Sequence, residues 1–149
     1  MKTSKAGIAV VERGFTLIEI MVVVVIIGLL AAIVTPKIIG NIDTAAINRA
    51  KQEIRTIETA MNLYRLDNFK YPTTEEGIQA LVTNPGQNSA PNWKPGGYLP
   101  RVPIDPWNNP YQYAYPGQRG REFDVYSLGA DGQEGGDDVN ADIGNWQLN

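Results

Sequence analysis

A single acidic residue interrupts the most apolar stretch of this 149-residue chain, and that combination constrains the fold more than any other feature. The stretch reads RGFTLIEIMVVVVIIGLLAAIVTP, residues 13–36, and its acid is Glu19. Every residue in 20–34 is apolar or Gly, and with Phe15 the segment reaches the ~20 residues that cross a bilayer core. An unpaired charge in hydrocarbon costs about 2.5 to 3.5 kcal/mol on insertion scales, so such residues persist where they are paired or functional. We therefore predict a transmembrane helix in which the charge of Glu19 is paired or functional.

Basic residues precede the apolar stretch and set its expected orientation. Residues 1–14 contain Lys2, Lys5 and Arg13. Because short basic segments stay in the cytoplasm, we expect this leader on the cytoplasmic side and the chain after Pro36 on the far side of the membrane. An ordinary secretory signal has a small-residue cleavage site after its apolar run. No A-x-A site follows the run here, and the small residue, Gly14, comes before it instead.

The composition removes several classes of function. The chain has no Cys and no His, and its formal net charge is −3. It therefore has no disulfide, no thiolate nucleophile and no zinc-thiolate site, and it lacks the commonest general base. Nucleic-acid binding needs clustered Lys and Arg, which the sequence does not show. We expect a protein that is not an enzyme and does not bind nucleic acid.

The apolar stretch closely resembles the class III signal of type IV pilins and of type II secretion pseudopilins. That signal combines a Gly, an aromatic residue and an intramembrane Glu at fixed offsets, here Gly14, Phe15 and Glu19. The resemblance implies that a prepilin peptidase cuts between Gly14 and Phe15 on the cytoplasmic side and then methylates the new N-terminal Phe15. Residues 1–14 are then a leader that is removed.

Cleavage supplies a possible partner for the buried acid. In a packed array of such helices, Glu19 is expected to accept the N-terminal amine of an adjacent subunit's Phe15, which neutralises both charges and fixes the stagger of the helices. The alternative is a tolerated glutamate near the membrane surface, whose carboxylate reaches water at small cost.

A second helical pattern follows Pro36. Its apolar residues recur at alternating spacings of three and four: Ile47, Ala50, Ile54, Ile57, Met61 and Tyr64. This spacing predicts an amphipathic helix over residues 43–68 that continues the apolar segment. At Pro36 the missing N–H and the ring favour a kink or local melting. The opposite face is either solvated or in contact with neighbouring subunits, and it carries Arg49, Lys51, Glu53, Arg55 and Glu58.

The chain after this helix predicts a short helix and a long loop. Thr73 and Glu76 have the spacing of a capping box, which predicts a helix over residues 74–82 that turns Ile78 and Leu81 inward. Residues 84–110 are dense in Pro, Gly and Asn, which indicates an irregular connection.

Two strand patterns follow the loop. The segments YQYAY, residues 111–115, and FDVYSL, residues 123–128, alternate in polarity around a turn and predict an antiparallel hairpin. A small sheet of this kind buries its inner face best on the apolar face of the long helix.

The last part of the chain is rich in Gly and Asp. Residues 128–146 contain five Gly, which are costly to order, and four Asp, which repel one another. Ca²⁺ binds six to eight oxygens of carboxylates and carbonyls, so a bound ion would order the glycine-rich backbone and neutralise the repulsion between the acids. The spacing is not that of an EF-hand, because Gln133 and Gly135 stand where Asp or Asn belongs. The residues alone leave a metal site and a solvated acidic loop equally open.

Three further stretches resemble one branch of the family, the major pseudopilins of type II secretion: LDNFKYPTTEEGIQALV, GYLPRVPIDPWNNPYQY and YSLGADGQEGGDDVNADIGNW. The absence of Cys separates the chain from type IV pilins, whose C-terminal loop is often closed by a disulfide. The resemblance implies calcium in the C-terminal loop, with Asp131, Asp138 and Asp142 as side-chain ligands and the Leu128 carbonyl as a backbone ligand. Asp137 is the least secure of the acids.

The expected fold is α+β and type IV pilin-like: a long N-terminal helix, membrane-spanning in its first half and amphipathic in its second, packed on a small antiparallel sheet with a calcium-bound C-terminal loop. Residues 15–36 form the transmembrane and assembly helix, to which Glu19 and Pro36 belong, and residues 37–149 form the periplasmic domain. The chain is expected in the bacterial inner membrane as a single-pass protein and in the periplasmic pseudopilus that it forms.

The function implied by the resemblance is that of a structural subunit. It polymerises into the pseudopilus of the type II secretion system and drives folded proteins across the outer membrane. Its expected partners are copies of itself, minor pseudopilins, the prepilin peptidase, membrane lipid, and an inner-membrane assembly platform with a cytoplasmic ATPase.

Two other functions stay open at this point. A type IV pilus subunit for adhesion or motility has the same fold and processing. A membrane-tethered, calcium-dependent binding module would use exposed aromatic residues as contacts, and Trp93, Trp107 and Trp146 are the candidates. In a small domain these side chains belong more often to the core.

Overall fold

The computed structural model describes residues 14–148, except for the side chains of residues 33–42. The predicted leader therefore lies outside the described residues apart from Gly14. The chain divides into two compact units, Met1–Ile39 and Gly40–Asn149, each of which is described by itself.

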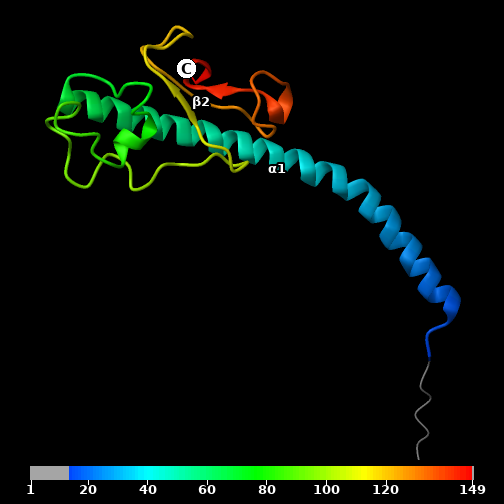
Figure 1. The fold of residues 1–149 in the computed structure, drawn as a ribbon. Helices are drawn as coiled ribbons and strands as arrows, with labels where there is room; N and C mark the ends of the chain where they lie inside the picture. The colour runs from blue at the N-terminus through cyan, green and yellow to red at the C-terminus, as the bar shows by residue number, and fades with distance from the viewer. Residues whose placement is uncertain (1–13, 149) are drawn as a thin grey trace, which may run out of the picture. The chain divides into compact units, whose positions relative to one another are not determined.

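One long helix, α1, runs from Leu17 to Asn68 and contributes to both units (Figure 1). It spans 52 residues, close to the predicted range. The backbone stays helical through Pro36. Local melting at this proline is therefore not seen in the secondary structure, since a proline removes only one donor and the turns on either side keep theirs. A kink at Pro36 stays a prediction.

The second unit buries the predicted apolar stripe of α1. Five of its six residues are almost completely buried: Ala50, Ile54, Ile57, Met61 and Tyr64. The sixth, Ile47, is partly buried and packs against this core. A fully buried side chain of this size stabilises the fold by about 1.5 to 3 kcal/mol. The stripe forms one hydrophobic core with residues in the sheet or directly beside its strands, including Tyr111, Phe123, Val125 and Ile143.

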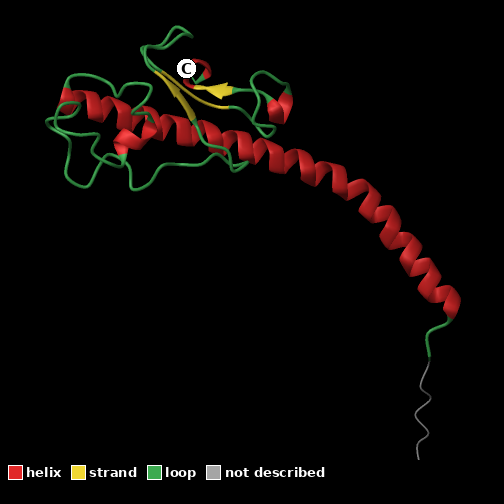
Figure 2. Cartoon of the chain, in the orientation of Figure 1, coloured by secondary structure: helices red, strands yellow, loops and turns green. Residues whose placement is uncertain are grey.

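The sheet has three short antiparallel strands in the order β1-β2-β3, and it lies along the second half of α1 (Figures 1 and 2). β1 spans Gln112–Ala114, β2 spans Asp124–Ser127 and β3 spans Ile143–Gly144. Tyr113 pairs with Val125 in the predicted hairpin. The third strand, which was not predicted, pairs with β2 and brings the C-terminal end of the chain onto the sheet.

The helix predicted after the capping box is largely absent. The capping box itself is confirmed: the Thr73 N–H donates to Glu76 Oε2 at 2.9 Å, and the Glu76 N–H donates to Thr73 Oγ1 at 3.2 Å. Only a turn follows, and then the short 3₁₀ helix η1, Ile78–Leu81. Gly77 has φ 58° and ψ −162°, a conformation that no α-helix contains, so the first turn cannot propagate. Ile78 and Leu81 are buried as predicted.

The charged face of α1 is partly solvated, with Arg49 and Arg55 exposed, but its two acids bind other parts of the second unit, which neither predicted alternative included. Glu53 accepts hydrogen bonds from the Tyr111 hydroxyl at 2.7 Å and from Arg49 at 3.0 Å. Glu58 accepts one from Asn145 at 3.2 Å. These acids therefore fix the loops and the sheet onto the helix.

The three tryptophans are partly buried, and two of them contact the core. Trp93 and Trp107 pack against the core, and the Trp93 indole N–H donates to the Ala80 carbonyl at 2.8 Å. Trp146 packs on Tyr126, with ring centroids 5.5 Å apart. Trp93 and Trp107 agree with the core interpretation, whereas Trp146 packs outside the core.

Several buried tyrosines differ in how their hydroxyls are satisfied. The Tyr64 hydroxyl is buried and has no hydrogen-bond partner among the described residues. Burial is the largest cause that raises the pKa of Tyr64 to about 12, and the charge of Glu76 adds to it. Burial and the hydrogen bond to Glu53 likewise raise the pKa of Tyr111 well above its ordinary value.

We expect Tyr64→Phe to stabilise the second unit and Tyr111→Phe to destabilise it. A buried polar group without a partner costs about 1 to 3 kcal/mol, whereas a hydrogen bond to a charged acceptor contributes about 1.5 to 3 kcal/mol. Urea unfolding of residues 40–149 measures both free energies of unfolding. A loss of stability in Tyr64→Phe would show that this hydroxyl has a partner.

We also expect the stability of the same unit to fall as the pH rises above about 10. A tyrosine whose pKa is raised by folding stays neutral in the folded state while the unfolded state releases its proton. Its contribution is complete below the unfolded pKa and is lost as the pH rises through the folded pKa, about 12 for Tyr64. Unfolding at fixed temperature from pH 8 to 12 measures this, and Tyr64→Phe should flatten the decline. An identical decline in that variant would contradict the assignment.

Candidate functional site

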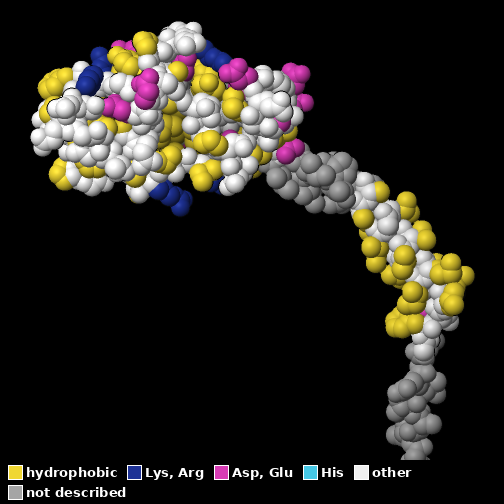
Figure 3. Space-filling view, viewed as in Figure 1, with side chains coloured by type: hydrophobic (Ala, Val, Ile, Leu, Met, Phe, Trp, Pro, Cys, Tyr) yellow, Lys and Arg dark blue, Asp and Glu magenta, His cyan; other side chains and the backbone are white. Residues whose placement is uncertain are grey.

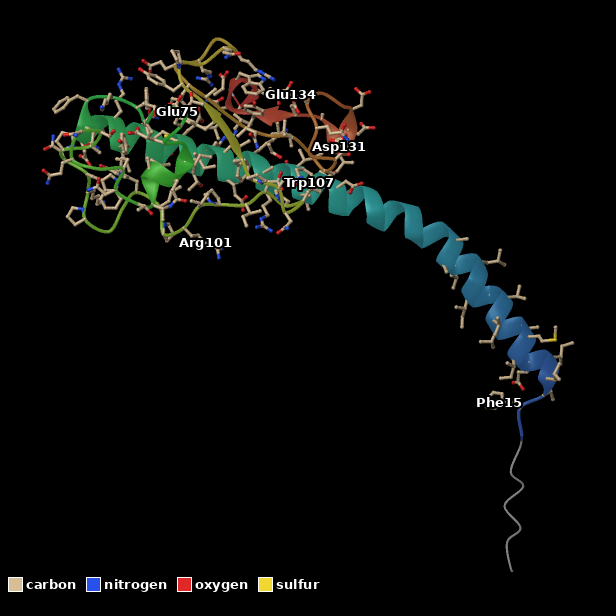
Figure 4. The ribbon with its side chains drawn as sticks, viewed as in Figure 1. Phe15, Glu75, Arg101, Trp107, Asp131 and Glu134 are labelled. Carbon is tan, nitrogen blue, oxygen red and sulfur yellow. The ribbon has the colours of Figure 1, made fainter. Side chains whose placement is uncertain are left out.

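The backbone just before α1 is accessible. Residues 14–16 have no regular secondary structure, and all three are exposed. The Phe15 side chain stands away from the helix that it precedes (Figure 4). A peptidase needs an exposed, non-helical bond, so the bond between Gly14 and Phe15 has a suitable local structure. Cleavage and methylation there stay predictions.

Glu19 has a local role that the sequence analysis missed. The Glu19 N–H donates to Thr16 Oγ1 at 3.3 Å, and the Thr16 N–H donates to Glu19 Oε2 at 3.4 Å. The two residues form a capping box at the start of α1. The signal was present in the sequence as the spacing Thr-x-x-Glu. The carboxylate therefore lies at the N-terminal end of the helix, where the helix dipole favours a negative charge.

The rest of the described apolar segment exposes its side chains. The large apolar residues from Leu17 to Leu30 are exposed, and Figure 3 shows hydrophobic side chains all along this part of the chain. An exposed apolar surface of this extent marks an interaction site.

Within the part of the chain that the structure describes, no helix meets the length and apolarity required for a membrane span.

The base of the C-terminal loop is fixed by a buried carboxylate. Asp105 accepts the N–H groups of Trp107 and Asn109 at 3.0 and 2.7 Å, and the Ser127 hydroxyl at 2.6 Å. Asn109 in turn donates to the Gly129 carbonyl at 3.1 Å. These bonds join the loop before β1 to the end of β2. The C-terminal loop, which follows β2, therefore begins at a well-fixed point.

The C-terminal loop folds back on itself, and two of its glycines lie against the Asn140 backbone. Gly129 has φ 70° and Gly136 has φ 82°. An added Cβ at Gly129 would lie 2.6 Å from the Asn140 carbonyl, and one at Gly136 would lie 2.5 Å from it. The Ala130 N–H donates to the Val139 carbonyl at 3.0 Å. Glycine is therefore required at both positions, for backbone conformation and for close approach.

The predicted calcium ligands differ in their surroundings. Asp142 Oδ1 is buried and has no hydrogen-bond partner among the described residues, and Asp142 Oδ2 lies 3.8 Å from Arg119. Asp131 lies in the exposed part of the loop (Figure 4) and accepts the Gln133 N–H at 3.1 Å. Asp138 is exposed, with φ 53°, and opens the 3₁₀ helix η2, Asp138–Asn140.

The three acids come from one loop but are not gathered at one point. No group of three or more acidic, His or Cys side chains among the described residues is close enough to hold a metal ion. One observation does fit a hard cation, because the unpartnered Asp142 Oδ1 is a buried oxygen ligand of the kind that Ca²⁺ prefers. Asp137 is exposed, and its backbone carbonyl accepts the Asn140 N–H at 3.0 Å.

Other residues that hold this region were not foreseen. Buried Asn145 accepts the Val125 N–H at 3.2 Å and donates to the Phe123 carbonyl at 3.0 Å, which ties the C-terminal end of the chain to β2. The Arg119 guanidinium lies 4.2 Å from the Trp146 ring centroid. Asn145 lies in a stretch that resembles the family, but neither its residue type nor that of Arg119 indicates these contacts, which only the fold creates.

Two family models match the chain and divide it near the start of the second unit. The model described as type II secretion system (T2SS), protein G matches residues 37–146. The model described as prokaryotic N-terminal methylation motif matches residues 11–35, which include Gly14, Phe15 and Glu19.

Full-length relatives carry the same description. Type II secretion system core protein G of Pseudomonas aeruginosa is 57% identical over 136 residues, 91% of this chain and 95% of that protein. Its counterpart in Vibrio cholerae is 51% identical over 137 residues, 92% of this chain and 93% of that protein.

A solved structure supports the same assignment. The crystal structure of the major pseudopilin from the type 2 secretion system of enterohaemorrhagic Escherichia coli superposes with a TM-score of 0.65 at 40% identity, and it covers 74% of this chain and 94% of that one. The predicted relationship to the pseudopilins is confirmed, and the chain belongs to the protein G family of the type II secretion system.

Proposed function

We propose that this chain is the subunit that polymerises into the periplasmic pseudopilus of a type II secretion system. The observation that carries the proposal is the agreement between full-length relatives named core protein G and a methylation motif placed at the start of α1. These names favour the pseudopilus over a type IV pilus, and no observation favours a separate binding module.

Processing and anchoring belong to the same proposal. A prepilin peptidase removes residues 1–14, and the apolar part of α1 anchors the mature chain in the inner membrane with the second unit in the periplasm. The exposed apolar side chains from Leu17 to Leu30 and the basic leader support this topology. An assembly platform with a cytoplasmic ATPase adds subunits at the membrane, and minor pseudopilins are the further partners.

Assembly depends on Glu19 in this proposal. After cleavage the amine of Phe15 lies at the start of the helix, four residues before Glu19. The carboxylate of one subunit neutralises the amine of its neighbour, which removes two charges from the apolar interior of the filament. The capping box with Thr16 holds the carboxylate near the helix start in the monomer.

Calcium is the proposed cofactor, and it stabilises the C-terminal loop. Asp131, Asp138 and Asp142 and the Leu128 carbonyl would hold the ion. The ion supplies positive charge to an acidic loop and favours the folded state by mass action. The buried, unpartnered Oδ1 of Asp142 supports the proposal.

We expect Glu19→Gln to abolish filament assembly while the protein still enters the membrane. Glutamine keeps the capping box, because a Gln side chain also accepts the Thr16 N–H, but it carries no charge for the neighbouring amine. Electron microscopy of sheared filaments and membrane fractionation measure the two properties. The matched control is Thr16→Ala, which removes the cap and keeps the charge. Normal filaments from Glu19→Gln would show that helix capping, and not charge pairing, is the role of Glu19.

We expect calcium to raise the melting temperature of residues 40–149. A ligand at about 100 times its Kd adds about 2.7 kcal/mol, which corresponds to roughly 10 °C or more for a domain of this size. Thermal unfolding in calcium and in chelator measures the shift.

Single variants assign the ligands. Asp138→Asn and Asp142→Asn should remove most of the calcium-dependent shift, whereas Asp137→Asn, the adjacent exposed acid, should keep it. A melting temperature that is the same in calcium and in chelator, or equal losses in all three variants, would contradict a specific ion site.

A further inference from the structure

Arg119, in the connection between β1 and β2, faces one oxygen of a proposed calcium ligand. Its Nη1 atom lies 3.8 Å from Asp142 Oδ2, a distance that makes an ion pair but is too long for a hydrogen bond. The Asp142 side chain is only 11% exposed, whereas that of Arg119 is 40% exposed. The contact therefore joins a nearly buried carboxylate to a cation at the surface.

Two aromatic rings hold the guanidinium in place. The Arg119 Cζ atom lies 4.2 Å from the ring centroid of Trp146 and 5.2 Å from that of Tyr126. A cation in this position is attracted by the electron-rich face of the ring. The Trp146 ring in turn packs on Tyr126 and covers Gly144 of β3 so closely that an added Cβ would collide with it. Arg119 therefore approaches Asp142 from a rigid support on the sheet.

The backbone of Asp142 is fixed as well. Its N–H donates to the Gly135 carbonyl at 3.2 Å, and its carbonyl accepts Gln147 Nε2 at 3.3 Å. With the backbone held and Oδ2 facing Arg119, the carboxylate has little freedom to rotate. The other oxygen, Oδ1, is buried and has no hydrogen-bond partner among the described residues. One oxygen of the carboxylate is thus compensated and the other is not, which is costly for a buried charge.

We propose that Arg119 is a positioning residue for calcium, which holds Asp142 Oδ2 so that Oδ1 stays in its buried position as a preformed ligand atom. This inference rests on the proposed calcium site and deepens it, because it gives a role to a residue that contacts the ligand and not the ion. Changing a residue that orients a metal ligand typically weakens metal binding by roughly 10- to 100-fold.

The positive charge of Arg119 also acts in the opposite direction. A cation beside the loop repels Ca²⁺, so the loss of a nearby arginine removes some repulsion. A positioning role therefore predicts weaker calcium binding without Arg119. A counter-ion that only competes with calcium for Asp142 predicts tighter binding. The sign of the change in affinity separates these two roles.

Calorimetric titration of calcium chloride into the full chain in detergent measures the Kd. Arg119→Gln should raise the Kd about tenfold. The matched control is Arg121→Gln, which removes the same charge two residues away, from a side chain that donates to the Asn145 carbonyl at 3.1 Å. This control should leave the Kd within about twofold of the wild-type value, because the distance dependence of the repulsion is weak in water. Arg119→Lys should recover most of the affinity, because the 3.8 Å contact depends on charge and not on a fork of hydrogen bonds.

The melting temperature in chelator is the second measurement, because it reports stability without calcium. A purely structural role would lower the melting temperature of Arg119→Gln in chelator and in calcium alike and leave the Kd unchanged. An unchanged or lower Kd in Arg119→Gln, no recovery in Arg119→Lys, or an equal loss in Arg121→Gln would overturn the positioning role and leave the calcium site in place. A wild-type chain that binds no calcium would overturn the proposed cofactor and this inference with it.

Discussion

One helix has to satisfy two environments, and the rest of the structure depends on this constraint. From Leu17 to Leu30, α1 exposes its large apolar side chains, whereas from Ala50 onward it buries one stripe under a three-stranded sheet. The second unit therefore carries a complete core of its own. Among the described residues, no side chain covers the apolar groups of the first part of the helix, and an exposed apolar surface of this extent marks an interaction site.

Buried polar side chains organise the part of the second unit that has little secondary structure. Asp105 joins the loop before β1 to the end of β2, and Asn145 joins the C-terminal end to β2. Each is almost fully buried and well satisfied by hydrogen bonds, as buried polar groups must be. These contacts do in a chain without Cys what a disulfide does elsewhere.

The helix and the hairpin were predictable, because the apolar stripe of α1 recurs at helical spacing and strand-forming residues flank the turn. The apolar stripe from Ala50 to Tyr64 and the capping box of Thr73 and Glu76 were correct in detail. The helix predicted over residues 74–82 was wrong, because a residue pattern does not show the backbone conformation of Gly77. β3 is two residues long and Asp105 acts across distant loops, so neither leaves a local signal. Of the site, the start of α1 was predictable from its motif, whereas the roles of Arg119 and Asn145 depend on contacts that only the fold creates.

The central claim is that Glu19 neutralises the amine of a neighbouring subunit. The most direct measurement is a cryo-electron microscopy map of the processed, wild-type filament at a resolution that resolves side chains. We expect the Glu19 carboxylate within hydrogen-bonding distance of the methylated amine of Phe15 on an adjacent helix. A carboxylate that contacts only Thr16 of its own chain, with the neighbouring amine elsewhere, would contradict the claim.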